Sequence, residues 1–189
     1  MTHVGEIIAS STTRFSAQCP DEDSAPAFGS FVVVDAAPEQ VIGVVAEVRA
    51  GTLDANRRPM AFGLSQEELF RQQPQLRELL ATEFDAVHVG YGDDVGVWRQ
   101  ILPPRPPRLH RFVQPAAPAE IAAVTADGDW LRTLAAAEVA DDLLAAAVRA
   151  SLAAHGDARD YLVRMGRVLA RLVGDDYERL QALLRRLRA

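Results

Sequence analysis

The chain has 189 residues, 49% of them hydrophobic, which is enough to fold as one large domain or two small ones. Its formal net charge of −6 argues against a general affinity for nucleic acid, and its single cysteine excludes an intrachain disulfide. All 20 basic residues are arginine, so a phosphate-binding loop of the G-x-x-x-x-G-K-[ST] type is excluded.

The beginning of the chain predicts four short β-strands of a small closed barrel. Runs rich in β-branched residues alternate with turn residues, as is typical of consecutive strands. The four predicted strands span residues Val4–Ser10, Arg14–Cys19, Gly29–Val34 and Val41–Val48. The N-terminus lacks the pattern of a signal peptide, and no run of about eighteen apolar residues is present. We therefore expect a cytoplasmic protein that makes no membrane contact.

A helical segment is predicted to interrupt the barrel. An irregular loop over residues 51–63 leads to Ser65, which with Glu68 three residues later has the pattern of a helical capping box. Pro74 should end this helix and allow a second short one. Strand alternation returns over Phe84–Tyr91, and a hairpin turn at residues 92–94 leads to a return strand over residues 95–102.

Two proline clusters, at residues 102–108 and 114–118, predict a stiff connector. Residues 109–113 between them could add an edge strand. Beyond this point alanine and leucine recur at spacings of three and four, which indicates helices. The predicted fold is α+β: a barrel domain with a helical insertion over residues 1–114, followed by a helical bundle over residues 115–189. These halves are expected to be separable.

Local signals divide the second half into about five helices. Pro118 suits the first position of a helix, and an aspartate precedes or opens each later one. The last two helices, joined by a glycine-aspartate turn, should form an antiparallel hairpin. The aspartates that we expect to cap or open helices are Asp129, Asp141 or Asp142, Asp157 and Asp175.

The order of the strands resembles the HAS-barrel, the small barrel at the N-terminus of HerA-type DNA translocases and of rotary ATP synthase ring subunits. The resemblance is carried by the segments Val4–Phe15, Gly29–Val32 and Gly43–Val48. It implies a barrel at the crown of a hexameric ring that contacts partner proteins such as a nuclease and does not itself hydrolyse ATP. A helical bundle stands where those relatives have their nucleotide-binding domain, so we expect a stand-alone barrel protein that lacks the ATPase domain.

The candidate partner-binding residues are arginines on or near the connector, because a guanidinium on a stiff segment can bind a carboxylate or phosphate with two hydrogen bonds. They are Arg57, Arg58, Arg105, Arg108 and Arg111. The simpler interpretation is that they only solvate a proline-rich connector. Arg185, Arg186 and Arg188 at the C-terminus are explained by the helix dipole.

Other residues that could carry chemistry have ordinary structural interpretations. Asp93 and Asp94 fit a hairpin turn, and His88 should lie on the polar face of its strand. Acidic neighbours should raise the pKa of Cys19. His3, His88, His110 and His155 lack the spacing of metal ligands.

The sequence therefore predicts no catalytic residue, no metal site and no cofactor. The expected function is a non-catalytic interaction or assembly module, which would contact a protein partner or a second copy and could be accessory to a larger oligomeric ATPase. Two alternatives remain at this stage. One is a nucleic-acid-binding accessory protein that uses the connector arginines, which the net charge disfavours, and the other is a hydrolase of an unrecognised type.

Overall fold

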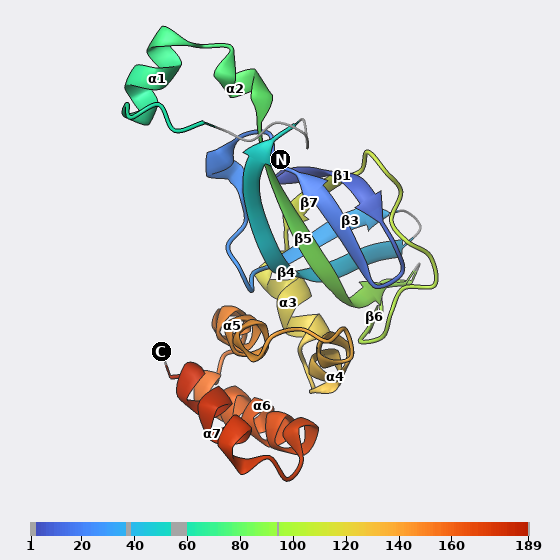
Figure 1. Cartoon of the computed structure of the whole chain (residues 1–189). Coiled ribbons are helices and arrows are strands. Elements are labelled where there is room, and N and C mark those ends of the chain that lie inside the picture. Colours follow the sequence, from blue (N-terminus) through green and yellow to red (C-terminus); the bar gives the residue numbers. More distant parts are fainter. Residues whose placement is uncertain (1–2, 37–38, 54–59, 94, 189) are drawn as a thin grey trace.

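The computed structural model describes residues 3–36, 39–53, 60–93 and 95–188. Within these residues, six antiparallel strands close a barrel in the order β1-β2-β5-β4-β3-β7 (Figure 1). The α+β class and the N-terminal barrel are thus confirmed. A seventh strand, β6, extends the sheet beyond β5. The strands are β1 Gly5–Ser10, β2 Arg14–Gln18, β3 Phe31–Ala36, β4 Glu39–Thr52, β5 Leu80–Gly92, β6 Trp98–Arg99 and β7 Phe112–Pro115.

Strand β7 has a different role from the edge strand that the sequence suggested. It lies between β1 and β3, and Val113 is the pairing partner of Gly5 on one side and of Val34 on the other. The segment after the first proline cluster is therefore part of the barrel wall. The prediction of an edge strand was wrong because pairings over about a hundred residues of sequence leave no local signal.

Along β3, β4 and β5 the barrel wall carries buried apolar side chains on both faces. Inside, side chains such as Ile7, Phe15 and Phe84 form a closed core. Outside, the β3–β4–β5 face carries Phe31 and Val44, which pack against the helices of the C-terminal half. Strands buried on both faces have continuous rather than alternating hydrophobic sequences, which explains the unbroken valine runs of β3 and β4.

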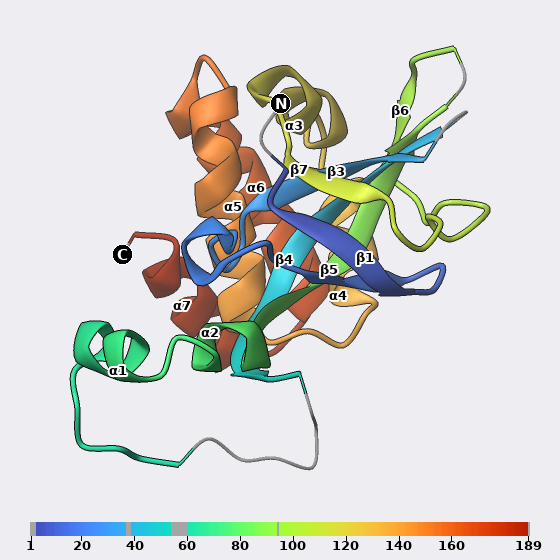
Figure 2. The same ribbon diagram turned by 90° about the horizontal axis from the view of Figure 1, so that it is seen from above.

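The helical insertion follows the prediction. Helix α1 (Gln66–Gln72) begins after Ser65, whose hydroxyl accepts a hydrogen bond from the Glu68 amide. Helix α2 (Leu76–Leu79) follows Pro74. Figures 1 and 2 show this insertion projecting from the barrel, close to the short 3₁₀ helix η1 (Glu22–Ser24), where the Gln66 side chain donates a hydrogen bond to Glu22.

The C-terminal half contains five α-helices and a 3₁₀ turn among its described residues. Asp157 caps its helix as predicted, accepting a hydrogen bond from the Asp160 amide. Two expected caps are displaced: Gly128 precedes the helix that Asp129 begins, and Asp176 rather than Asp175 caps the last helix. The elements are α3 Pro118–Val124, α4 Asp129–Ala135, α5 Asp141–Ser151, η2 Leu152–Ala154, α6 Ala158–Val173 and α7 Tyr177–Arg186.

Helices α3, α4 and α5 lie next to the barrel, and the α6–α7 hairpin lies beyond them at the far end of the molecule (Figure 1). Trp130 on α4 packs edge-on against Phe31 of the barrel, with ring centroids 5.5 Å apart. Gly29 has a φ of 82° and sits so close to α5 that an added Cβ would lie 2.5 Å from the Cβ of Ala146. Barrel and helices thus share one hydrophobic cluster, and the division at residues 114 and 115 into separable domains stays a prediction.

In the part of the chain that the structure describes, the helices are too short or too polar to cross a lipid bilayer.

Candidate functional site

The connector, predicted to run from residue 102 to residue 118, covers residues 100–111 between β6 and β7, since the second proline cluster belongs to β7 and the start of α3; it is attached to the body of the protein at its start. The side-chain oxygen of Gln100 accepts a hydrogen bond of 2.9 Å from the Trp130 amide. The carbonyl oxygen of Gln100 accepts one of 2.8 Å from the Thr133 hydroxyl. Farther along, Pro103 and Pro107 are buried. The proline rings therefore anchor the segment on the protein as well as stiffening it.

The connector is also fixed at its end. His110 has a positive φ of 63°, an uncommon conformation for a residue with a side chain, and its amide donates a 2.9 Å hydrogen bond to the Ile7 carbonyl. Its Nδ1 donates to Glu6 Oε1 at 2.7 Å. The Arg111 carbonyl then accepts a hydrogen bond from the Ile7 amide, and the chain enters β7. The backbone that carries the arginines is thus ordered by contacts with β1.

Arg105, Arg108 and Arg111 all extend into solvent from this fixed backbone. None of the three has an ion-pair partner among the described residues. Arg49 illustrates the contrast, because it lies within 4 Å of three carboxylates, including Asp85. The connector arginines remain available for an external carboxylate or phosphate.

Exposed apolar side chains lie between these arginines in the sequence. Ile101, Leu102, Leu109 and Phe112 are each between 42% and 58% exposed. The His3 ring packs against Phe112, with centroids 4.4 Å apart. A mixture of arginine, aromatic and aliphatic side chains is typical of protein–protein interfaces. We call this set the connector surface: Ile101, Leu102, Arg105, Arg108, Leu109, Arg111 and Phe112.

Arg57 and Arg58, the other two predicted partner-binding residues, lie outside the described residues. Asp94 lies outside them as well. Asp93 is a turn residue, as expected: its carboxylate accepts hydrogen bonds from the amides of Val95 and Val97 and from the Arg99 side chain. The bond from the Val97 amide contributes most to lowering the pKa of Asp93.

His88 is where the sequence prediction was wrong. It points into the barrel, fully buried, with Phe15 at a ring-centroid distance of 5.7 Å. Burial lowers its pKa to about 4, and a hydrogen bond with the Thr12 carbonyl acts in the opposite direction. Since a carbonyl only accepts, Nδ1 carries the proton of the neutral ring, and Nε2 faces the interior without a partner among the described residues.

Cys19 is also buried. Two effects keep its thiol protonated: the acidic neighbours, as predicted, and more strongly its burial. Burial raises its pKa to about 11, with smaller contributions from the charges of Asp21 and Glu83. A thiol that stays protonated near neutral pH is a poor nucleophile. The described residues contain no cluster of three histidine, cysteine, aspartate or glutamate side chains that could hold a metal ion.

A polar cluster that sequence reasoning missed lies among the helices. The hydroxyls of Ser151 and Tyr161 are 2.9 Å apart, and Thr125 Oγ1 is 2.8 Å from Nε2 of His155. The His155 ring stacks on Tyr161, with ring centroids 3.7 Å apart, and the guanidinium carbon of Arg164 lies over the Tyr161 ring, 5.5 Å from its centroid. These residues lie on α5, on α6 and just after α3 and η2, so no spacing in the sequence could reveal the cluster. Its hydrogen bonds join the helices together.

These observations define a class: a small closed barrel with a helical insertion and an ordered, arginine-bearing connector, covered on one face by helices. Residues 4–94 match the family model of the HAS barrel domain, which confirms the resemblance carried by the strands. The match covers the N-terminal region of the chain, and the HAS barrel domain is a non-catalytic kind of module used in assembly and interaction. No curated protein matches the chain.

Proposed function

We propose that the protein is a non-catalytic interaction module that contacts its partner through the connector surface. The observation that carries this proposal is the arrangement of Arg105, Arg108 and Arg111, three exposed guanidiniums that have no ion-pair partner among the described residues and stand on a backbone anchored at both ends. An ordered segment loses little conformational entropy on binding, so its contacts contribute more fully to affinity. The HAS barrel domain, with its role in assembly, supports the same function.

The partner that fits this surface is a protein that presents carboxylates beside an apolar patch. Guanidinium groups bind carboxylates with two parallel hydrogen bonds, and Leu109 and Phe112 supply the apolar contact. By family, such a partner would be a larger oligomeric ATPase or a protein bound to one. A cytoplasmic location is part of this proposal.

The two alternatives lack a comparable observation. A nucleic-acid-binding role would use the same arginines against the net charge of −6. A hydrolase would need titratable side chains that converge on a cleft, whereas Asp93 holds a turn and His88 and Cys19 are buried in the barrel.

Replacing Arg105, Arg108 and Arg111 together with serine tests the proposal. Affinity capture from the native cell, quantified by mass spectrometry, should recover a protein with the wild-type chain that the triple variant captures about 30-fold more weakly. This figure follows from three contacts of about 0.7 kcal/mol each. The matched control replaces three exposed arginines of the helical half, Arg159, Arg171 and Arg185, with serine and should capture the partner normally.

If the partner is a second copy of the chain, sedimentation velocity of the wild type, the triple variant and the control variant tests the proposal instead. The thermal midpoint of the triple variant should equal that of the wild type, because the three side chains make no ion pairs among the described residues. Equal capture by the triple variant, or equal loss in the control, would contradict the proposal. Oligonucleotide binding that falls steeply between 50 and 200 mM salt and depends on the connector arginines would favour the nucleic-acid alternative.

A further inference from the structure

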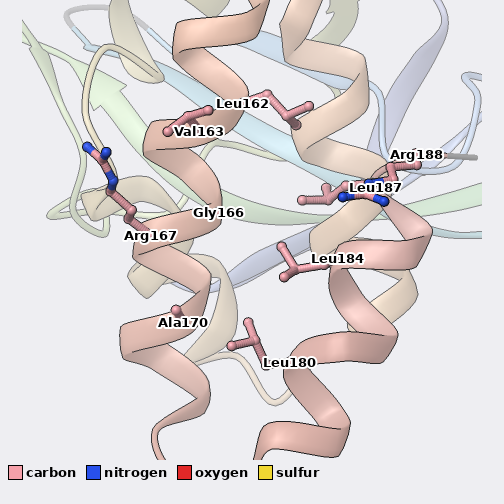
Figure 3. A pocket seen from close by; sticks show the side chains of 9 residues that line it. All are labelled: Leu162, Val163, Gly166, Arg167, Ala170, Leu180, Leu184, Leu187 and Arg188. Atoms are coloured by element: carbon pink, nitrogen blue, oxygen red, sulfur yellow. The ribbon is translucent and has the colours of Figure 1, made fainter.

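The α6–α7 hairpin carries an apolar groove with a volume of about 340 Å³ (Figure 3). Leu162 on α6 and Leu180 and Leu184 on α7 line it, and Gly166 and Ala170 form its α6 wall. Arg167 and Arg188 stand at its rims. The groove lies between α6 and α7 and opens to solvent.

The groove adjoins the surfaces that stabilise the fold: Leu187, another of its lining residues, belongs to the shared hydrophobic cluster, and Leu162 and Leu184 pack against that cluster. Helix α6 packs inward through Tyr161, Met165 and Leu169, which are buried in the shared hydrophobic cluster. Leu162, Gly166 and Ala170 form a second stripe at a spacing of four residues, one position along from the buried one. Next to this stripe, Val163 is 46% exposed in the middle of the helix. The second stripe meets α7 at Leu184 and is only partly buried, so apolar surface remains open between the two helices.

Gly166 keeps the groove open, although the packing of the two helices does not require a glycine at this position. Glycine is a poor residue for the interior of a helix compared with alanine. A Cβ added at Gly166 would meet only the Cδ2 of Leu184, at 3.7 Å, which is an ordinary contact. A larger residue is therefore compatible with the helix pair, but it would occupy the space between α6 and α7.

The charge at the rims indicates the kind of occupant. The lining contains Arg167 and Arg188 and no acidic residue, in a chain whose acidic residues outnumber its basic ones, 26 to 20. Neither arginine has an ion-pair partner among the described residues. Pairing of the groove with the same groove of a second copy would bring these guanidiniums toward one another, which like-charge repulsion opposes.

We propose that the groove binds an acidic amphipathic helix of another protein. Apolar residues of that helix at a spacing of three and four would fill the groove between α6 and α7, and its flanking carboxylates would pair with Arg167 and Arg188. The site would complete a three-helix arrangement for which the hairpin already supplies two antiparallel members. It shares no residue with the connector surface, so either site can exist without the other.

Two synthetic helical peptides test the proposal on the full chain. Both carry leucines at the spacing of three and four, and they differ only in flanking glutamates or flanking lysines. In fluorescence anisotropy the glutamate peptide should bind the wild-type chain at least about tenfold more tightly than the lysine peptide. The double variant Arg167→Glu/Arg188→Glu should reverse this preference.

Gly166→Met should abolish binding of the glutamate peptide, and Gly166→Ala should preserve it while leaving the thermal midpoint equal or higher. The connector variant that replaces Arg105, Arg108 and Arg111 with serine should bind the peptide normally. The proposal is overturned if the two peptides bind alike, if neither binds, or if the charge-reversed variant keeps the wild-type preference. It is also overturned if sedimentation velocity shows a dimer that Gly166→Met abolishes, because the occupant would then be a second copy.

Discussion

His88 should make the protein lose stability as the pH falls from 6.5 to 4. In the folded state its pKa is held at about 4 by burial, against an ordinary value of 6.5 in an unfolded chain. Between these two values the unfolded chain binds a proton that the folded protein does not, so the free energy of unfolding decreases as the pH is lowered. The stabilisation is fully present above pH 6.5, and below about pH 4 no further loss comes from this residue.

The gap between 6.5 and about 4 corresponds to about 3 kcal/mol over the whole range, of which about 2 kcal/mol should be lost between pH 7 and pH 4.5. With a urea dependence of about 2 kcal/mol per molar, the unfolding midpoint should fall by about 1 M. The structural cause is specific. Protonation places a charge and an N–H at Nε2 in the barrel interior, where no acceptor is present among the described residues.

The assay is urea unfolding followed by circular dichroism at pH 7 and pH 4.5, for the wild type and for His88→Asn. Asparagine retains a donor for the Thr12 carbonyl and cannot titrate, so the variant should show a much smaller change between the two pH values whatever its own stability. His155→Asn controls for the contribution of His155, a half-buried ring whose pKa is also lowered by burial. Asp85 and Asp141 have pKa values below 3.8 and stay charged in this range. The reasoning fails if His88→Asn keeps the full pH dependence of the wild type.

Two further predictions concern the assembly of the fold. A chain truncated after residue 94, where the family match ends, should not form the closed barrel, because it lacks β7 between β1 and β3. A chain truncated after residue 117 retains that strand. Near-ultraviolet circular dichroism should therefore show fixed tertiary packing in the longer chain alone. Gly29→Ala should lower the free energy of unfolding, measured by urea unfolding, by about 1–3 kcal/mol, because the added Cβ would overlap Ala146 and the residue has a positive φ. The control is Gly51→Ala, because no atom lies within 4 Å of a Cβ added at Gly51. This variant should change the free energy of unfolding little.

Local chemistry made much of this protein predictable from its sequence. Ser65 and Asp157 were recognised as helix caps because a cap depends on side chains and amides within one turn. The last helix shows the limit of this reasoning: Asp175 and Asp176 are adjacent, both can cap, and the structure uses the second. The barrel strands and the connector arginines were found in the same local way, from β-branched runs and proline clusters.

The tertiary structure alone decided which surfaces face each other, because these contacts join residues far apart in the chain. Strand alternation placed His88 opposite Val87, but both faces of β5 are covered, one by the barrel interior and one by helices, so hydrophobicity could not show that His88 points inward. The same holds for β7, whose partners in β1 are about a hundred residues away. The periodicity of α6 and α7 predicted two amphipathic helices. Only their packing showed that the stripe containing Gly166, next to the fully buried one, stays partly open between the two helices.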